Sequence, residues 1–340
     1  MSQLVDQGTL TKKDFASKQD VRWCPGCGDY SILSSVQSVM PEIGVPKEKI
    51  VFVSGIGCSS RFPHYMSTYG FHSIHGRAPS VATGLKLANP DLSVWVVTGD
   101  GDGLSIGGNH LIHCIRRNID LKILLFNNKI YGLTKGQYSP TSDVGTKAKS
   151  TPYGSIDRAF NAISVAIGSQ ATFVARTIDT DPKHMQEIFK RAAEHKGTAF
   201  VEILQNCVIF NDKVHSPITS PENKIANQLR LEHGKPMLFG KDNKNGVRLN
   251  PNTLDLEIVE VGSNGITEQN ILVHDEKRIN PTIHFLTGEL DTPAALGVIR
   301  NVEGPNFEEE VYKQITKVKE LKGEGNLEKL LNSGETWTIE

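Results

Sequence analysis

Long apolar runs alternate with helix-like segments along the first two thirds of the chain. The runs at 49–55, 92–99, 121–128, 171–177 and 198–204 are rich in Val, Ile, Leu and Phe. Segments with helical spacing separate these runs, for example 29–40, 78–90, 107–118, 155–168 and 182–197. Apolar runs of this length between helices are typical of strands that are covered on both faces. The pattern therefore predicts an α/β fold with a doubly wound parallel sheet.

The composition changes at both ends of this region. Residues 1–20 are polar and are expected to form an N-terminal arm, whereas 21–212 carry the alternating pattern. Residues 213–340 hold too few apolar side chains for a second large core, so we expect a C-terminal extension that contacts another subunit or covers a site. Within it, the charged segment 307–323 predicts a helix with a solvated face.

Charge and hydropathy exclude several classes of protein. The formal net charge is −1, which gives no electrostatic basis for binding nucleic acid or an anionic membrane. No run approaches the ~18 apolar residues of a membrane span. The N-terminal residues lack the apolar core of a secretion signal, so we expect a cytoplasmic protein. Five cysteines, an odd number, favour metal ligation or redox chemistry over a disulfide framework.

A glycine-rich motif marks the end of one predicted strand and two asparagines mark the end of the next. Gly99-Asp100-Gly101 follows the strand at 92–99, and Asn127-Asn128 closes the strand at 121–128. Glycines let a backbone approach phosphates closely, and parallel strands bring their carboxyl ends to one edge of a sheet. A carboxylate with neutral oxygens suits Mg²⁺. This spacing predicts a site for a magnesium-bound diphosphate.

Four further cysteines occur in polar segments or at strand ends. Cys24 and Cys27 share a CPGC loop, Cys58 follows the strand at 49–55, and Cys207 follows the strand at 198–204. Four thiolates suit either zinc or an iron–sulfur cluster, and buried free thiols are the third alternative. An organic diphosphate cofactor that takes up electrons from its substrate is served by a one-electron carrier beside it. We therefore favour a [4Fe–4S] cluster for the four cysteines. Cys114 lies on the apolar stripe of a predicted helix and is expected to be a core residue.

Seven motifs in order, WCPGCGD, SGIGCSSR, HSIHGRA, LKLANP, GDGDGLSIGG, NNKIYGLTKGQ and the late cysteine, resemble the β subunits of 2-oxoacid:ferredoxin oxidoreductases. The resemblance covers about residues 20–230. It implies thiamine diphosphate, Mg²⁺ and one [4Fe–4S] cluster, held by Cys24, Cys27, Cys58 and Cys207. The GIGCSSR and IHGRA segments look most like the 2-oxoglutarate branch, and the pyruvate and branched-chain branches remain alternatives.

The resemblance also implies the roles of individual residues. Asp100, Asn128 and the carbonyl of Ile130 look like the magnesium ligands. The thiamine diphosphate would further contact a larger set: Gly57, Cys58, Ser59, His75, Gly76, Arg77, Gly99, Gly101, Asp102, Tyr131, Gly132, Leu133 and Thr134.

Four side chains are candidates for catalysis. Lys135 is expected to receive the C1 carboxylate of the substrate, and His75 and Arg77 to hydrogen-bond the cofactor or an intermediate. Arg61 has three open roles: binding a distal carboxylate, tuning the cluster, or forming a surface ion pair. Lys135 also has the simpler interpretation of a solvated surface lysine.

The implied reaction is the oxidative decarboxylation of 2-oxoglutarate with coenzyme A to succinyl-CoA and CO2, with single electrons passing to ferredoxin. It is reversible as a reductive carboxylation. Activation of thiamine diphosphate needs a carboxylate at its pyrimidine end, and this chain shows no second domain to supply one. We therefore expect an α subunit that contributes a glutamate, in an αβ or α2β2 assembly. A non-oxidative thiamine-diphosphate lyase and a non-catalytic scaffold are the alternatives of other classes.

Overall fold

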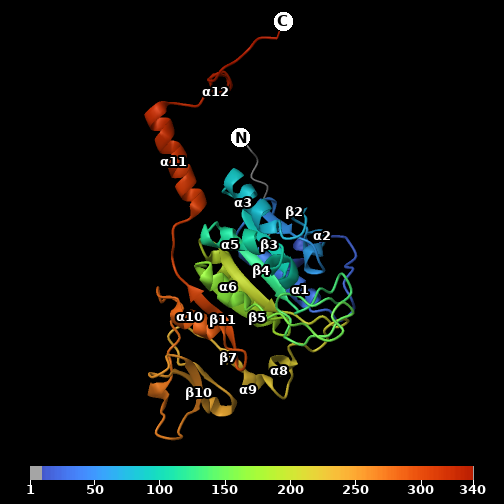
Figure 1. The fold of residues 1–340 in the computed structure, drawn as a ribbon, viewed down its shortest axis with the longest axis vertical. Coiled ribbons are helices and arrows are strands. Elements are labelled where there is room, and N and C mark those ends of the chain that lie inside the picture. The colour runs from blue at the N-terminus through green and yellow to red at the C-terminus, as the bar shows by residue number, and fades with distance from the viewer. Residues whose placement is uncertain (1–9, 340) are drawn as a thin grey trace.

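The computed structural model describes residues 10–339, whose strands form an eight-stranded sheet and a three-stranded sheet (Figure 1). The strands are β1 (Ile50–Ser54), β2 (Tyr69–His72), β3 (Ser93–Gly99), β4 (Leu121–Asn127), β5 (Phe173–Ile178), β6 (Ala199–Leu204), β7 (Gln228–Arg230), β8 (Leu238–Phe239), β9 (Asn245–Leu249), β10 (Leu256–Glu260) and β11 (Ala294–Asn301).

The large sheet has the strand order β2-β1-β3-β4-β6-β5-β11-β7. Its first six strands are mutually parallel, β11 runs antiparallel to β5, and β7 runs parallel to β11. The predicted doubly wound parallel sheet is therefore confirmed, with two strands, β11 and β7, that run opposite to the first six and that the sequence pattern did not indicate. Every residue of β4, β5 and β6 is buried, as expected for strands that are covered on both faces.

Helices cover both faces of this sheet (Figure 1). They are α1 (Asp29–Val39), α2 (Phe62–Tyr65), α3 (Ala78–Ala88), α4 (Asp100–Leu104), α5 (Gly108–Arg116), α6 (Ala162–Gly168), α7 (Pro182–Glu194), α8 (Ser216–Thr219), α9 (Lys224–Asn227), α10 (Thr282–Gly288), α11 (Phe307–Lys322) and α12 (Leu327–Leu331). Short 3-10 helices occur at Lys12–Phe15, Met40–Glu42, Lys47–Lys49, Ser59–Arg61, Lys241–Asn243 and Glu268–Asn270.

Two hydrophobic cores lie on the two faces. Alternate side chains of β4 enter different cores: Ile123 and Leu125 pack with residues of α3, α5 and α6, whereas Leu124 and Phe126 pack with residues of α1 and α7. This two-sided alternation is what a covered strand requires. Phe126 is 1% exposed, and truncating a buried phenylalanine of this kind to alanine costs about 3–5 kcal/mol.

Helix α6 begins later than the segment 155–168 suggests. It starts at Ala162 because Asn161 caps it, with Asn161 Oδ1 accepting a hydrogen bond from the Ser164 backbone N–H at 3.1 Å. Asparagine is among the strongest N-cap residues because its side chain satisfies a helix donor that has no intrahelical partner. The residues just before Asn161 therefore belong to the loop that follows β4.

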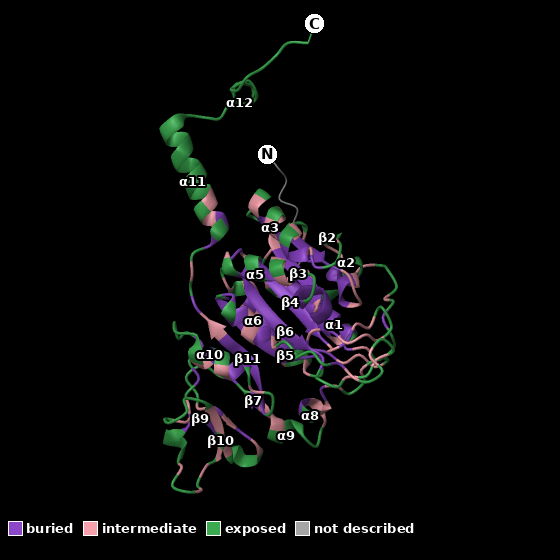
Figure 2. Cartoon of the chain, in the orientation of Figure 1, coloured by how far each residue is buried: buried purple, intermediate pink, exposed green. Residues whose placement is uncertain are grey.

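The residues after 212 contribute to both sheets. β7 and β11 extend the large sheet, and β8, β9 and β10 form the small antiparallel sheet. Helices α11 and α12 then project away from the body (Figure 1), and Figure 2 shows them as largely exposed. None of the helices within residues 10–339 is long and apolar enough to cross a membrane.

Candidate cofactor site

The sheet order reverses between β1 and β3, because β2 lies on one side of β1 and β3 on the other. Open α/β sheets bind ligands at such a reversal, beyond the carboxyl ends of the strands. A narrow cavity of about 50 Å³ lies at this position. It is lined by Ile56, Gly57, Cys58, Ser59, His75, Gly99, Asp100, Gly101, Asp102, Phe126, Asn128, Ile130, Tyr131, Gly132, Leu133 and Thr134.

Every residue predicted to contact the cofactor lines this cavity except Gly76 and Arg77. Gly76 lies behind the wall, where its φ is +67° and a Cβ would come within 2.4 Å of Gly107. Only glycine fits there without displacing backbone. The guanidinium of Arg77 contacts the imidazole of His110 in α5. These two residues therefore shape the wall rather than face the cavity.

Asp100 is the first residue after β3 and is 2% exposed. Burial raises the pKa of its carboxyl, although hydroxyl donors from Ser139 and Thr141 oppose this shift. Thr141 Oγ1 donates to Asp100 Oδ2 at 2.6 Å. A nearby cation would favour the ionised form of such a buried carboxyl. The charge and the burial of Asp100 thus fit a ligand of Mg²⁺.

The two asparagines at the end of β4 point in different directions. Asn128 lines the cavity with Asp100 and Ile130. Asn127 instead donates from Nδ2 to Glu202 at 2.7 Å. Successive side chains of an extended segment alternate between its faces, so only one of the two asparagines can reach the cavity. Asp100, Asn128 and Ile130, the residues predicted to bind Mg²⁺, therefore line one cavity.

Asp102 has a different position from the one expected for a residue that only lines the diphosphate. It is 3% exposed, and its Oδ1 accepts the backbone N–H groups of Ile56 at 3.2 Å and Gly76 at 2.9 Å. His75 Nδ1 lies 2.9 Å from the same oxygen, and the hydroxyl of Thr98 donates to Oδ2 at 2.9 Å. Asp102 therefore holds together the loops that follow β1 and β2.

His75 presents its other ring nitrogen away from Asp102. A carboxylate partner at Nδ1 assigns the proton to that nitrogen, which leaves Nε2 as an acceptor in the neutral ring. The side chain is about half exposed and lines the cavity. Gly55 allows this arrangement, since a Cβ on it would lie 1.9 Å from Asp102 Oδ2.

The other two candidate catalytic residues lie outside the cavity. Lys135 is exposed and has a φ of +75°, in a turn where its N–H donates to the Gly132 carbonyl at 3.0 Å. Arg61 donates from Nη1 to the carbonyl of Arg22 at 3.0 Å, and its charge partly opposes the rise that burial causes in the pKa of Cys58. Arg61 therefore faces the cysteine loops rather than the cavity.

The four strand-end and loop cysteines share one neighbourhood. In the CPGC loop the Cys27 N–H donates to the Cys24 carbonyl at 3.0 Å. A Cβ built on Gly132 would lie 3.5 Å from Cys207 Sγ and 3.7 Å from Cys58 Sγ. Cys58 also lines the cofactor cavity, so the cysteine neighbourhood and the cavity have a common wall.

The charges of these cysteines also affect one another's pKa. The pKa of Cys58 is raised to about 11, first by burial, then by Asp29 and by the charges of Cys207 and Cys24. Burial likewise raises the pKa of Cys27, with contributions from Asp29, Cys207 and Cys58. Among residues 10–339, no three His, Cys, Asp or Glu side chains are placed to hold a single metal ion. Cys114 is buried in the core, as expected from its helical stripe.

Sequence reasoning missed three polar residues at this site. Ser139 and Thr141 donate hydrogen bonds to Asp100 from a loop with no recognisable motif. Gln205 is 1% exposed and lies between Asn128 and Cys27. The only signal for it was its place at the end of a predicted strand, two residues before Cys207.

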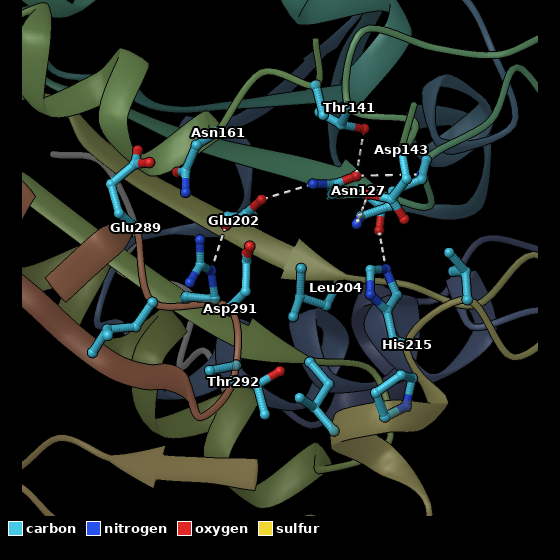
Figure 3. A pocket seen from close by; sticks show the side chains of 18 of the residues that line it. Asn127, Thr141, Asp143, Asn161, Glu202, Leu204, His215, Glu289, Asp291 and Thr292 are labelled. Carbon is cyan, nitrogen blue, oxygen red and sulfur yellow. Dashed lines mark hydrogen bonds and ion pairs between the residues drawn. The ribbon is translucent and has the colours of Figure 1, made fainter. Parts of the chain in front are cut away.

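A second, larger cavity of about 400 Å³ lies on the other side of Asn127. Figure 3 shows Asn127 between Thr141 and Glu202, with a line of hydrogen bonds through its amide. Glu202 Oε2 pairs with Arg176 Nε at 2.6 Å. Burial would raise the pKa of Glu202, but Arg176 and Asn127 outweigh burial and the pKa is lowered.

Known proteins resemble the chain over this region and beyond it. Residues 55–203 match the family described as "Thiamine pyrophosphate enzyme, C-terminal TPP binding domain". This match confirms that the sheet is of the thiamine-diphosphate-binding type and that the chain carries such a domain.

Two relatives and one solved structure extend the comparison. The "2-oxoglutarate oxidoreductase subunit KorB" of Mycobacterium tuberculosis is 49% identical over 334 residues, covering 96% of this chain and 88% of that protein. The "2-oxoacid:ferredoxin oxidoreductase subunit beta" of Saccharolobus solfataricus is 50% identical over 192 residues, covering 56% of this chain and 63% of that protein.

The solved structure is a 2-oxoglutarate:ferredoxin oxidoreductase from Magnetococcus marinus with 2-oxoglutarate, coenzyme A and succinyl-CoA bound. Its matching chain superposes with a TM-score of 0.75 at 32% identity, covering 96% of this chain and 97% of that chain. The chain therefore belongs to the β-subunit family of the 2-oxoacid:ferredoxin oxidoreductases.

Proposed function

We propose that this chain is the β subunit of a 2-oxoglutarate:ferredoxin oxidoreductase. The complex would convert 2-oxoglutarate and coenzyme A into succinyl-CoA and CO2 and pass electrons to ferredoxin, and it would also run in reverse. The observation that carries the proposal is the wall shared by the cavity and the cysteines, where Cys58 lines the cavity and Gly132 adjoins both Cys58 and Cys207.

The cavity supports thiamine diphosphate with Mg²⁺ through its donor set. Asp100, Asn128 and the carbonyl of Ile130 would hold Mg²⁺ through three oxygen atoms, the kind of ligand that this ion prefers. Gly99 and Gly101 leave the backbone open toward phosphates. When bound, thiamine diphosphate takes the electron pair that remains as CO2 departs, and a [4Fe–4S] cluster accepts single electrons.

Cys24, Cys27, Cys58 and Cys207 are the proposed cluster ligands. Their support is one shared neighbourhood and the mutual influence of their charges on thiol pKa values. Trp23 donates from Nε1 to the Cys58 carbonyl at 2.7 Å, which holds the Cys58 loop against the start of the CPGC segment.

His75 and Arg61 have distinct proposed roles. His75, oriented by Asp102, offers Nε2 to the cofactor or to the substrate bound on it. Arg61 acts on the cysteines by charge, because its guanidinium favours the thiolate of Cys58 against the effect of burial and does not line the cavity. Lys135 is the proposed contact for the substrate carboxylate, from an exposed turn directly after Thr134.

An α subunit is the proposed source of the activating glutamate. Large apolar side chains are exposed beside the cavity: Ile74 is 68% and Ile106 61% exposed. Ile74 precedes His75, and Ile106 adjoins Gly76. Exposed apolar groups in contiguous patches mark surfaces that another protein covers, and an α subunit docked here would close the cavity from outside.

The complex of both subunits, purified without oxygen, tests the proposal. About four irons and about four acid-labile sulfides per β chain, with coenzyme A-dependent ferredoxin reduction that prefers 2-oxoglutarate, are expected. Preference for pyruvate or a branched-chain 2-oxoacid would move the chain to another branch of the family. Iron-free protein that still decarboxylates 2-oxoacids would favour a non-oxidative lyase.

A further inference from the structure

Gln205 touches both candidate cofactor sites. It follows the last residue of β6 and is 1% exposed, and its backbone N–H donates to the Asn127 carbonyl at 2.9 Å. Its Oε1 accepts a hydrogen bond from Asn128 Nδ2 at 2.8 Å. Its Nε2 donates toward Cys27 Sγ at 3.3 Å. One side chain therefore bonds a proposed magnesium ligand and a proposed cluster ligand.

The direction of these hydrogen bonds follows from the groups at each end. The Ile130 N–H donates to Asn128 Oδ1 at 3.2 Å, so the amide nitrogen of Asn128 faces Gln205. Gln205 must then present its oxygen to Asn128, which leaves Nε2 to donate to Cys27 Sγ and to the Asn206 carbonyl. The reverse orientation would place two amide nitrogens, both donors, against each other.

The contact is also held in place by its surroundings. A Cβ on Gly28 would lie 3.0 Å from Cγ of Gln205 and closer still to Asp179, so the loop after Cys27 packs directly on the Gln205 stem. A buried amide with both N–H groups and its oxygen bonded has no freedom to turn. Gln205 is therefore a rigid connection between the strand ends and the CPGC loop.

We propose that Gln205 is a positioning residue that couples the occupancy of the magnesium–diphosphate site to the reduction potential of the cluster. This inference rests on the proposed function. An N–H donor to a cluster thiolate stabilises the charge that one-electron reduction adds, which raises the potential. Mg²⁺ held by Asn128 Oδ1 would draw electron density from that amide and strengthen its donation to Gln205. Gln205 in turn becomes a stronger donor to Cys27, because hydrogen bonds in a chain polarise one another.

Two consequences follow. Binding of magnesium thiamine diphosphate raises the potential of the cluster, so the loaded site faces a better electron acceptor. Coupling between two binding equilibria is reciprocal, so reduction of the cluster tightens the binding of Mg²⁺ and its cofactor by the same factor.

The test is a redox titration of the complex, followed by the EPR signal of the reduced cluster, with and without magnesium thiamine diphosphate. Gln205→Met keeps the length of the side chain and removes its hydrogen bonds to Asn128, Cys27 and the Asn206 carbonyl without adding charge. Gln205→Glu keeps an acceptor for Asn128 and removes the donor to Cys27. Gln186→Met, in α7, is the matched control. Mg²⁺ affinity is measured alongside by the concentration needed to retain thiamine diphosphate.

Wild type and Gln186→Met are expected to show a higher midpoint potential when the cofactor is bound. Gln205→Met and Gln205→Glu are expected to lose that response. Gln205→Met is also expected to bind Mg²⁺ about tenfold more weakly, the effect of one lost hydrogen bond, whereas Gln205→Glu keeps its Mg²⁺ affinity.

An equal response to the cofactor in wild type and in both Gln205 variants would overturn the inference. If Gln205→Met failed to retain iron, Gln205→Glu would still decide the question. A wild-type complex without any cluster signal would instead refute the proposed function, so the two failures are separate results.

Discussion

Asp102→Asn is the substitution that most directly tests how the cofactor cavity is built. The Asp102 carboxylate accepts three N–H donors and one hydroxyl, and it ties the loops after β1 and β2 to β3. Asparagine keeps one acceptor oxygen and loses the charge. Hydrogen bonds to a charged acceptor contribute about 1 kcal/mol more than neutral ones, so three N–H donors imply a loss of about 3 kcal/mol.

The loss converts to a melting temperature through the unfolding entropy. At roughly 2.1 cal/mol/K per residue, a chain of 340 residues has an unfolding entropy of about 0.7 kcal/mol/K, and the melting temperature falls by about 4 °C. Scanning calorimetry of the complex gives this value. Asp91→Asn is the control, because the Asp91 side chain is exposed and pairs with Lys49 at 3.4 Å. Its expected effect is within about 0.5 kcal/mol.

A second readout separates a positioning role from direct cofactor contact. Loss of the charged partner frees the His75 ring, so thiamine diphosphate should bind the Asp102→Asn complex more weakly even where the fold is intact. An Asp102→Asn complex with the melting temperature and the cofactor affinity of wild type would refute the view that this carboxylate holds the cavity walls.

Four further predictions follow from single residues. Burial lowers the pKa of His195 to about 4, so the stability that the neutral imidazole contributes is fully present above pH 6.5 and is lost as the pH falls. Between pH 7 and 5 the unfolding free energy of wild type should fall by about 2 kcal/mol more than that of His195→Asn. An equal fall in both proteins, measured by urea unfolding, would contradict this. Gly132→Val should lower iron content while Gly132→Ala, whose Cβ makes ordinary contacts with two sulfurs, should retain it; equal iron in both would count against the cysteine assignment. Arg61→Ala should shift the cluster potential and leave the preference for 2-oxoglutarate over pyruvate unchanged, and a changed preference would restore the substrate-binding role. Lys135→Ala should raise KM for the 2-oxoacid with thiamine diphosphate affinity unchanged, and an unchanged KM would leave Lys135 as a solvated residue.

The parallel sheet could be predicted because strand chemistry is local. The apolar runs that form β1, β3, β4 and β6 are long enough to be predicted as strands from sequence alone. The ends of β3 and β4 then predict the edge of the sheet at which Asp100 and Asn128 lie. The exposed strand β2 has no such signature, since its sequence is YGFH and it pairs with β1 at the edge of the sheet. Burial there is decided by tertiary context and not by local propensity.

The strand pairing of the C-terminal extension, residues 213–340, likewise could not be predicted from local sequence. β11 is an apolar run within a polar extension, and its antiparallel pairing with β5 depends on the path of the chain from 213 to 293. Pairing between distant segments leaves no periodic trace in sequence. Gln205 is the corresponding case at the site, because its significance comes from two contacts, Asn128 and Cys27, that lie 77 and 178 residues away in the chain.

Substrate-driven reduction of the cluster tests the central claim, that the diphosphate cavity and the four cysteines form one electron path. The complex is mixed anaerobically with 2-oxoglutarate and coenzyme A, without any other reductant, and its EPR spectrum is recorded. The account predicts the reduced-cluster signal in wild type and its absence in Asp100→Asn, which should keep its iron and its reduction by dithionite. A wild-type cluster that dithionite reduces but 2-oxoglutarate with coenzyme A leaves oxidised would contradict the account.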